Sequence, residues 1–246
     1  MATDHFGRVA NHYASHRPIY PAALFVWLAS QCADHTLAWD CGAGSGQASI
    51  ALTTHFEQVL ATDMSAEQLV LAIPHPRIEY RAALAESSGL PDHSADIVTV
   101  AQALHWFDLD RFYAEVRRVL KPGGIVAAWS YGVMAVDGDE VNAVLEDFYH
   151  RVIGPYWPAE RHHVETGYRE LPFPFQRIEP PTLEMQADWT LPHLAGYLRS
   201  WSASARHAEN TGRDAVNEVV ARLAPCWGDA SFKRSVRWPL AMLVGR

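Results

Sequence analysis

Short apolar runs and helical stretches alternate along the first half of the chain. Four apolar runs have the length and composition of buried strands, and they cover residues 37–41, 58–63, 95–104 and 125–132. Three segments between these runs have helical periodicity, and they cover residues 47–56, 65–73 and 109–120. Strands that alternate with helices predict a parallel α/β sheet joined by right-handed crossovers.

Local signals mark where two of these helices begin and end. Ser65, followed by Glu67 and Gln68, predicts a helix N-cap. The sequence KPGG at residues 121–124 predicts the end of the helix over residues 109–120. Proline cannot continue a helix, and glycine readily adopts a left-handed cap conformation.

The chain changes character after residue 132. Residues 139–153 and 191–223 look helical, and a proline-rich aromatic stretch at residues 154–175 separates them. The last segment, residues 232–246, ends in a strand-like run, and the chain contains no internal repeat. This organisation predicts one nucleotide-binding core with a helical insertion.

Composition narrows the classes of partner. The chain carries 20 Lys and Arg against 28 Asp and Glu, and this acidic balance argues against a protein that binds nucleic-acid phosphates. No apolar run approaches the ~18–20 residues that span a bilayer, and the first residues lack the apolar region of a signal peptide. The three cysteines are never spaced C-x-x-C, which is typical of a reducing compartment. We therefore expect a cytoplasmic protein without a membrane or nucleic-acid partner, and its oligomeric state is left open.

A glycine-rich loop joins the first strand to its helix. Its sequence, DCGAGSGQ at residues 40–47, lets the backbone turn tightly and approach a ligand. No Lys follows the loop, which excludes a P-loop, and Gln47 occupies the position of the third glycine in a dinucleotide loop. Asp63 ends the second strand, where an acid accepts hydrogen bonds from ribose hydroxyls and repels the 2′-phosphate of NADP. A nucleoside-containing ligand and a tight turn without a ligand both fit this pattern.

Four motifs then follow one another in a known order. The segments DCGAGSGQ, ATDMS, ALAESSGLPDHSADIVTVAQALHWFD and LKPGGIVAAW resemble the successive motifs of class I S-adenosylmethionine-dependent methyltransferases, over about residues 35–132. The segments HYASHRPIYP, WSASARH and VRWPLAMLVGR resemble the subgroup that contains trans-aconitate methyltransferase and its small-molecule relatives. The resemblance implies an α/β fold: a Rossmann-like, doubly wound, mostly parallel seven-stranded sheet with an antiparallel C-terminal strand and a helical cap.

The same resemblance divides the chain into three parts. They are N-terminal cap helices at residues 1–34, a cofactor-binding core at residues 35–132, about 172–190 and 232–246, and a helical substrate-side lid at residues 133–171 and 191–231. Five of the nine Trp follow residue 132, outside the cofactor motifs. We expect these aromatic side chains to line a substrate pocket.

The resemblance also implies the cofactor, S-adenosyl-L-methionine, which is released as S-adenosyl-L-homocysteine. Asp40 would help to hold the ammonium group of the cofactor, Asp63 would bind its ribose hydroxyls, and Met64 would pack on its adenine. The cofactor-binding residues implied in this way are Asp40, Gly42, Ala43, Gly44, Asp63, Met64, Ala85, Glu86, Gln102 and Tyr13. A solvated loop carboxylate is the alternative interpretation of Glu86, and Cys41 is interpreted as a small side chain that fills the turn.

Candidate substrate-side residues follow from position. His105 and Trp106 come directly after the apolar run at residues 95–104, at the edge where α/β sheets bind ligands. The candidate catalytic residues are His105 as a base or hydrogen-bond donor, Trp106 as a pocket wall and Arg17 as the partner of a carboxylate. A loop histidine, a core tryptophan and a surface arginine are the alternatives.

The predicted function is methyl transfer from S-adenosylmethionine to a small-molecule acceptor, with a carboxylate oxygen as a candidate acceptor atom. The protein would act mainly by positioning the reactants for an in-line displacement. Two alternatives stay open: an NAD-dependent oxidoreductase with an atypical loop, and a cofactor-binding module without catalysis. The histidine pairs 12/16 and 162/163 have no neighbouring cluster of further ligands, so we expect no metal.

Overall fold

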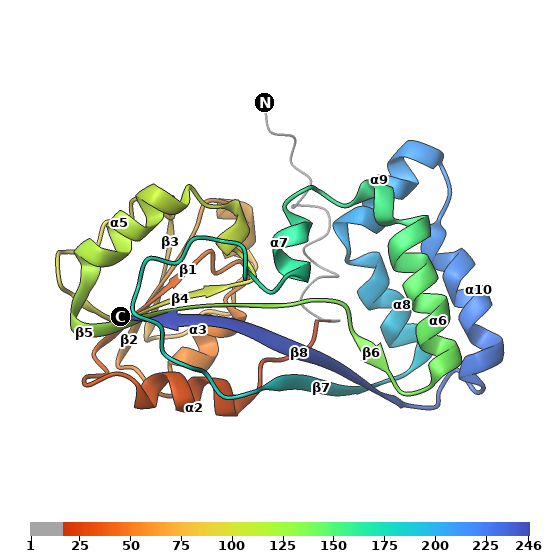
Figure 1. Cartoon of the computed structure of the whole chain (residues 1–246), viewed down its shortest axis with the longest axis horizontal. Coiled ribbons are helices and arrows are strands. Elements are labelled where there is room, and N and C mark those ends of the chain that lie inside the picture. Colours follow the sequence, from red (N-terminus) through yellow and green to blue (C-terminus); the bar gives the residue numbers. More distant parts are fainter. Residues whose placement is uncertain (1–16) are drawn as a thin grey trace. The chain divides into compact units, whose positions relative to one another are not determined.

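The chain forms two compact units in the computed structural model, which describes residues 17–246 (Figure 1). The larger unit contains Tyr20–Gly132, His162–Glu184 and Pro239–Arg246. The smaller unit contains Val133–Arg161 and Met185–Trp238, together with the described residues up to Ile19. Residues 162–171 were predicted to be part of the lid, and they belong to the larger unit. Residues 185–190 and 232–238 were predicted to be part of the cofactor-binding core, and they belong to the smaller unit.

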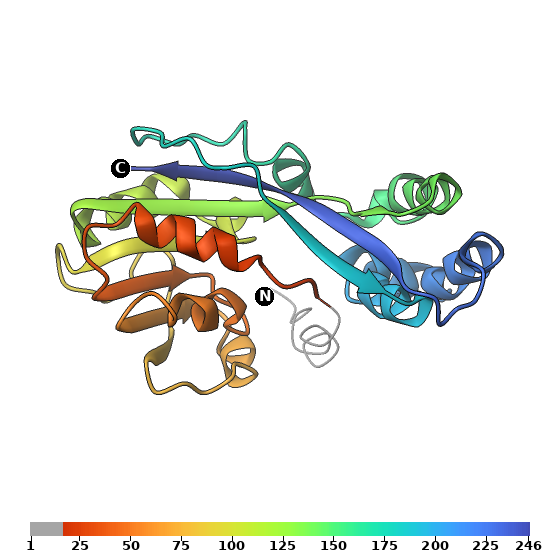
Figure 2. The ribbon, with the colours of Figure 1, turned by 90° about the horizontal axis from the view of Figure 1, so that it is seen from below.

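A mostly parallel sheet forms the core of the larger unit. Its parallel strands follow the order β3-β2-β1-β4-β5, and they are β1 (Leu37–Cys41), β2 (Gln58–Asp63), β3 (Ile78–Ala82), β4 (Ala95–Ala101) and β5 (Leu120–Tyr131). The last strand, β8 (Arg234–Gly245), pairs antiparallel with β5 through residues 240–245 (Figure 2). This arrangement confirms the predicted α/β class, with a mostly parallel sheet and an antiparallel C-terminal strand.

Two short strands pair with β8 as well. β6 (Ala135–Val136) runs antiparallel to the N-terminal half of β8, with Ala135 opposite Arg237. β7 (Glu184–Trp189) also pairs with β8. The part of the chain from residue 17 onward thus contributes eight strands to the sheet, one more than expected, because β8 is long enough to have partners in both units.

Helices cover both faces of the sheet in the larger unit. They are α2 (Ala22–Ser30), α3 (Gln47–Leu52), α4 (Ala66–Val70) and α5 (Leu109–Val119). α2 and α3 lie on one face and α5 lies on the other (Figure 1). Two fully buried tryptophans mark these faces: Trp39 of β1 lies 6.2 Å from Phe112 of α5, and Trp129 of β5 lies 6.1 Å from Phe25 of α2, between ring centroids. Such aromatic contacts bury a large apolar area on each face.

The smaller unit is built around helices and buried tryptophans. Its elements include α6 (Asp139–Asp147), a π-helical turn (Phe148–Val152), a 3-10 turn (Gly154–Tyr156), α8 (Leu191–Arg199), α9 (Ser202–Thr211) and α10 (Ala215–Trp227). A short helix, α7 (Arg161–Glu165), begins where the smaller unit gives way to the larger one. Trp189, Trp201, Trp227 and Trp238 are at most 7% exposed. These four side chains pack in the core of the unit and do not have the exposure of pocket walls, whereas the fifth late tryptophan, Trp157, is partly exposed, and its predicted place in a substrate pocket stays a prediction.

The predicted bounds of the strands are most accurate where an apolar run ends in an acidic residue. β1 and β2 have the predicted bounds. The hydroxyl of Ser65 accepts a hydrogen bond from the amide of Gln68 at 3.3 Å, which confirms the predicted N-cap of α4. The half-exposed edge strand β3 has no continuous apolar run, and the hydrophobic pattern did not predict it.

The KPGG segment differs from its prediction. Helix α5 ends at Val119, one residue before the predicted end, and β5 begins at Leu120 instead of residue 125 and contains the whole segment. Leu120 pairs with Ala95 of β4, and the ammonium of Lys121 lies 2.7 Å from the buried carboxylate of Asp96. These contacts keep the segment extended beside β4.

No helix in the described part of the chain is both long enough and apolar enough to cross a membrane.

Candidate active site

The loops after the parallel strands meet at one edge of the sheet. Cys41 at the end of β1 lies opposite Thr62 of β2, and Asp63 at the end of β2 lies opposite Ala82 at the end of β3. Because these strand ends are in register, the loops that follow them start side by side. Open α/β sheets bind their ligands outside this edge.

Backbone hydrogen bonds hold the glycine-rich loop against the end of β2. The amides of Gly42 and Ala43 both donate to the carbonyl of Thr62, at 2.8 and 2.9 Å. The next amide, of Gly44, donates to Oδ2 of Asp63 at 2.8 Å. The loop is therefore fixed in position by the same strand that carries the predicted ribose ligand.

The three glycines of the loop have left-handed backbone angles for different reasons. A Cβ on Gly42 would lie 2.6 Å from Cβ of Ala103, and a Cβ on Gly46 would lie 2.6 Å from the hydroxyl of Tyr80. Packing within the protein therefore requires glycine at position 42, and a side chain at position 46 would displace the ring of Tyr80. Gly44 has a φ of +55°, and a Cβ there would meet only the side chain of Gln68, at 3.8 Å. The open face of Gly44 is where a ligand can approach the backbone.

Asp63 is held so that its carboxylate faces the loop. Oδ1 accepts a hydrogen bond from the amide of Ser65 at 2.9 Å, and Oδ2 accepts the one from Gly44. A carboxylate has about four acceptor sites, so both oxygens can accept further hydrogen bonds. The side chain is partly exposed. Asp63 can therefore bind a diol without giving up its contacts to the protein.

Asp40 is fully buried beneath this edge. The hydroxyl of Ser49 donates to Oδ2 at 2.5 Å, and the hydroxyl of Thr99 donates to Oδ1 at 2.9 Å. Burial raises the pKa of Asp40 to about 6. The structure thus shows Asp40 joining β1 to α3 and β4, and its contact with a cofactor ammonium stays a prediction. Burial also raises the pKa of the Cys41 thiol well above its ordinary value, which makes it a poor nucleophile.

The loop after β3 contacts the start of α5. Ala85 is buried in the apolar core, and Oε1 of Glu86 accepts a hydrogen bond from the amide of Asp108 at 3.0 Å. Asp108 in turn caps α5 by accepting from the amide of Arg111. Glu86 is therefore more than a solvated loop carboxylate, since it joins two loops of this edge. The approach of both residues to adenine stays a prediction.

Gln102 joins the ends of β4 and β5. Its amide donates to the carbonyl of Trp129 at 2.9 Å, and its side-chain Nε2 donates to the carbonyl of Tyr131 at 3.1 Å. Its φ is +60°, which a residue other than glycine rarely adopts. Strain of this kind persists where surrounding contacts enforce it, and it is common at ligand sites.

His105 and Trp106 lie on the turn that follows. They belong to a 3-10 turn, Leu104–Trp106, in which Leu104 is fully buried and Trp106 is 50% exposed. The two rings lie 4.7 Å apart, and Nδ1 of His105 lies 3.1 Å from the hydroxyl of Tyr168. Tyr168 was not among the residues predicted for this site. Only the glycine before it, which is typical of a turn, could have drawn attention to the position.

Comparison with known proteins decides the family. Residues 39–128 match the model of a methyltransferase domain. A protein of Dictyostelium discoideum named "Putative methyltransferase" is 32% identical over 250 aligned positions, which cover 99% of this chain and 95% of that protein. The chain belongs to the methyltransferase family.

Two further similarities extend over much of the methyltransferase. A solved structure titled "Putative Type II Methyltransferase", from Anaeromyxobacter dehalogenans, is 47% identical with a TM-score of 0.88, over 94% of this chain and 97% of that chain. An uncharacterized methyltransferase of Mycobacterium tuberculosis is 40% identical over 178 residues, which cover 66% of this chain and 70% of that protein. The predicted enzyme class, an S-adenosylmethionine-dependent methyltransferase, is confirmed, and none of these proteins supports the oxidoreductase alternative.

The sheet edge of the methyltransferase fits this cofactor. Met64 and Leu84 follow the ends of β2 and β3, and they are 76% and 52% exposed. They give the region beside Asp63 an apolar surface on which a purine ring can pack. Together with the open face of Gly44, this edge offers a hydrogen-bond acceptor, an apolar platform and accessible backbone.

For some predicted residues a role at this edge stays a prediction. Arg17 belongs to the smaller unit, and Tyr13 lies outside the described residues. The pair at positions 12 and 16 also falls outside them. His162 contacts Glu170, with Nε2 2.8 Å from the carboxylate. Within residues 17–246, no group of three His, Cys, Asp or Glu side chains is arranged to hold a metal ion.

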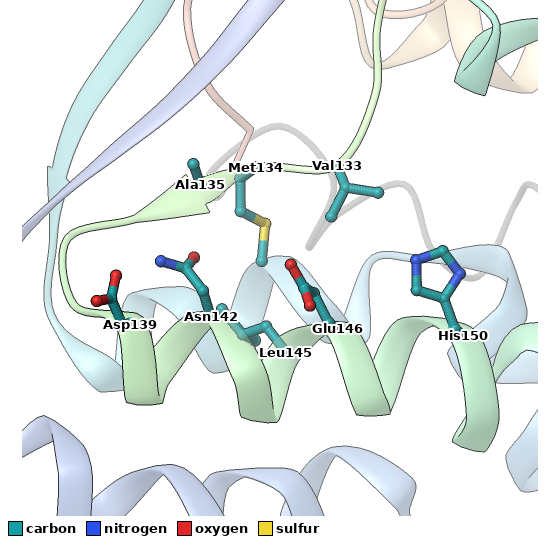
Figure 3. A pocket seen from close by; sticks show the side chains of 8 residues that line it. All are labelled: Val133, Met134, Ala135, Asp139, Asn142, Leu145, Glu146 and His150. Atoms are coloured by element: carbon teal, nitrogen blue, oxygen red, sulfur yellow. The ribbon is translucent and has the colours of Figure 1, made fainter.

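The smaller unit of the methyltransferase contains a hollow of its own, of about 490 Å³ (Figure 3). It is lined by Val133, Met134, Ala135, Asp139, Asn142, Leu145, Glu146 and His150. The side chain of Asn142 is hydrogen-bonded to the backbone of Val136. Its Oδ1 accepts from the amide of Val136, and its Nδ2 donates to the carbonyl of the same residue. Asp139 and Glu146 point into the hollow from α6, so an anionic ligand would be repelled there.

Proposed function

We propose that the methyltransferase binds S-adenosylmethionine at the carboxyl edge of its parallel sheet and transfers the methyl group to an oxygen of a small carboxylate. The observation that carries this proposal is the position of Asp63. Its carboxylate ends β2, is oriented by the amides of Gly44 and Ser65, and lies beside exposed Met64 and Leu84. A ribose diol and an adenine ring require these two kinds of surface side by side.

When bound, S-adenosylmethionine supplies an activated methyl group on a sulfonium. The residues of the chain then have to hold the acceptor atom in line and exclude water. In this proposal Asp63 binds the ribose hydroxyls, and the backbone at Ala43 and Gly44 lies along the methionine part. Gln102 fixes the loop that brings His105 and Trp106 to the same edge.

The acceptor side rests on His105 and Trp106. A carboxylate is ionised at neutral pH, so its oxygen is already nucleophilic and needs a hydrogen-bond donor rather than a base. His105 can donate such a hydrogen bond, and the half-exposed Trp106 provides an apolar wall. The formal net charge of −8 disfavours a nucleic-acid acceptor. The resemblance of the terminal segments to the trans-aconitate methyltransferase subgroup favours a small carboxylate.

Calorimetry with S-adenosylhomocysteine and with NAD tests the cofactor site. The wild type should bind the former and not the latter. In Asp63→Asn the ribose loses its charged hydrogen-bond acceptor, so binding should weaken by about 1.5–3 kcal/mol, or about 10- to 150-fold.

Asp34→Asn is the matched control, because Asp34 is an exposed carboxylate that precedes β1. It should bind like the wild type. Urea midpoints of the three proteins should show that Asp63→Asn remains folded. Unchanged affinity in Asp63→Asn would remove Asp63 from the site, and binding of NAD alone would overturn the assignment of the cofactor.

An acceptor screen with methyl-labelled S-adenosylmethionine tests the reaction. Label in small carboxylates should be released as methanol by mild base, because methyl esters hydrolyse readily. Base-stable label in an ether or an amine would refute a carboxylate acceptor while leaving the methyltransferase assignment intact.

A further inference from the structure

The side chain of Arg161, in the smaller unit, is held against aromatic rings. Its Nε donates a hydrogen bond to the hydroxyl of Tyr149 at 2.8 Å. Its Cζ lies 4.7 Å from the centroid of the Trp157 ring and 5.7 Å from that of Tyr149. The two rings lie 5.3 Å apart, and the Trp157 ring also lies 5.6 Å from that of the buried Trp201. The guanidinium group is therefore fixed in orientation on an aromatic surface.

The terminal nitrogens of Arg161 are open to a ligand. Within residues 17–246, the guanidinium group donates only the hydrogen bond to Tyr149, and no carboxylate forms an ion pair with it. The side chain is partly exposed, and neither Nη1 nor Nη2 is an enclosed atom. A guanidinium group carries donors on all three nitrogens, so both terminal nitrogens remain available.

Other arginines of the smaller unit have carboxylate partners. Nη2 of Arg213 lies 2.8 Å from Glu218, and Nη2 of Arg222 lies 2.7 Å from Asp147. At Arg161 aromatic rings take the place of such a partner. A positive charge that is partly removed from water and lacks a counterion attracts an anion.

A second arginine adds positive charge beside these rings. Nη1 of Arg206 lies 3.5 Å from the carbonyl of Tyr156, the residue before Trp157, and Arg206 forms no ion pair in the described part of the chain. The indole N–H of Trp157 is enclosed and has no acceptor among the described residues. The nearby carboxylate of Glu160 forms no hydrogen bond or ion pair with these groups there. Donor groups around Arg161 therefore lack acceptors.

We propose that Arg161 binds the carboxylate group of a small organic acid through its terminal nitrogens. The planar fork of a guanidinium group matches the two oxygens of a carboxylate. The rings of Trp157 and Tyr149 offer apolar contact to a carbon skeleton, which inorganic phosphate lacks. The ligand belongs to the same chemical class as the acceptor in the proposed function, but the proposal depends only on contacts within the smaller unit.

A titration followed by NMR of the indole N–H groups tests the proposal on the full chain. Acetate, succinate and benzoate are added at constant ionic strength, and the signal of Trp157 is assigned by its loss in Trp157→Phe. At least one acid should shift this signal with a Kd of about 1 mM or below. Acetamide, succinamide and benzamide, the uncharged counterparts, should not shift it, because they lack the charge that the guanidinium group attracts.

Variants of Arg161 separate the fork from the charge. Arg161→Lys keeps the positive charge but loses the fork, so the acid should bind about 10-fold more weakly. Arg161→Gln loses both, and the loss should be about 10- to 150-fold. Arg213→Lys is the matched control, because Arg213 is paired with Glu218 in the same unit, and it should bind like the wild type. Urea midpoints should show that the variants remain folded.

Three results would overturn the proposal. They are the absence of binding by all three acids, equal affinity in the wild type and Arg161→Gln, and binding of inorganic phosphate in place of the acids. The first of these, together with a lower urea midpoint in Arg161→Lys, would show that Arg161 only stabilises the aromatic rings. Failure of the wild type to bind S-adenosylhomocysteine would instead overturn the proposed function, and the titration of Trp157 does not depend on it.

Discussion

Asp40 allows a quantitative prediction about the buried contacts at the sheet edge. Its carboxylate is fully buried and accepts hydrogen bonds from Ser49 and Thr99. These hydroxyls only partly replace water, so burial raises the pKa of Asp40 from 3.8 to about 6. The perturbation is Asp40→Asn, which keeps the shape but cannot ionise and replaces one acceptor oxygen with an NH2 group, to which a hydroxyl can turn its lone pair.

The magnitude follows from linkage. Because the pKa is higher in the folded state, the folded protein binds the proton more tightly and loses stability as the pH rises from about 4 to about 6. A rise of about two pKa units corresponds to about 3 kcal/mol in all, of which about 2 kcal/mol develops between pH 4.5 and pH 7. The free energy of unfolding of Asp40→Asn, relative to the wild type, should therefore increase by about 2 kcal/mol over this interval.

Urea unfolding followed by circular dichroism at the two pH values measures this change. The comparison requires that the free energy of unfolding falls with urea concentration at the same slope in both proteins.

Glu115→Gln serves as a control, because the pKa of Glu115 is shifted in the opposite direction to that of Asp40. The hydrogen bonds from Arg118 and Ser88 lower the pKa of Glu115 to about 2, so its stabilising effect is nearly complete above pH 4.5 and is lost only as the pH falls further. The difference between Glu115→Gln and the wild type should change by less than about 0.5 kcal/mol between the two pH values. If Asp40→Asn behaves in the same pH-independent way, the reasoning about its burial is refuted.

Two further predictions concern backbone geometry. Gly42→Ala should lower the urea midpoint strongly, because its Cβ would lie 2.6 Å from Ala103, whereas Gly123→Ala, at a φ of +83° with no atom within 4 Å, should lose only about 1–2 kcal/mol to backbone strain. Equal losses in the two variants would contradict the packing argument. Ser65→Ala should lower the unfolding free energy by about 1 kcal/mol through loss of the N-cap bond to Gln68, and an unchanged melting temperature would show that this bond contributes nothing.

The sequence predicted most of the fold where burial is uniform. β1 and β2 are buried along nearly their whole length, so their apolar runs and terminal acids marked their bounds. β3 lies at the edge of the sheet and alternates half-buried with exposed positions, so it left no apolar run to detect. The early start of β5 depends on the pairing of Leu120 with Ala95, a contact that local turn signals cannot report.

The candidate site likewise has a part that the sequence could predict and a part that it could not. Asp63 and the glycine-rich loop could be predicted because adjacent strand ends bring them together through short connections. The contact between His105 and Tyr168 joins residues 63 positions apart, and it depends on a left-handed turn and on the packing of Gly167 against β8. No periodicity or motif marks such a contact. Four of the five late tryptophans are buried in the core of the smaller unit, and composition could not predict this because it does not distinguish a pocket wall from a core.

The pairing of β8 with β5 has a consequence for the newborn chain. Residues 240–245 pair with one edge of β5, but they are translated only after residues 132–239. During that interval β5 presents an open row of amides and carbonyls, which can pair with the same strand of another nascent chain. A chain that lacks residues 240–245 would therefore aggregate rather than form a smaller enzyme. The larger unit can complete its sheet only after residues 240–245 have been translated.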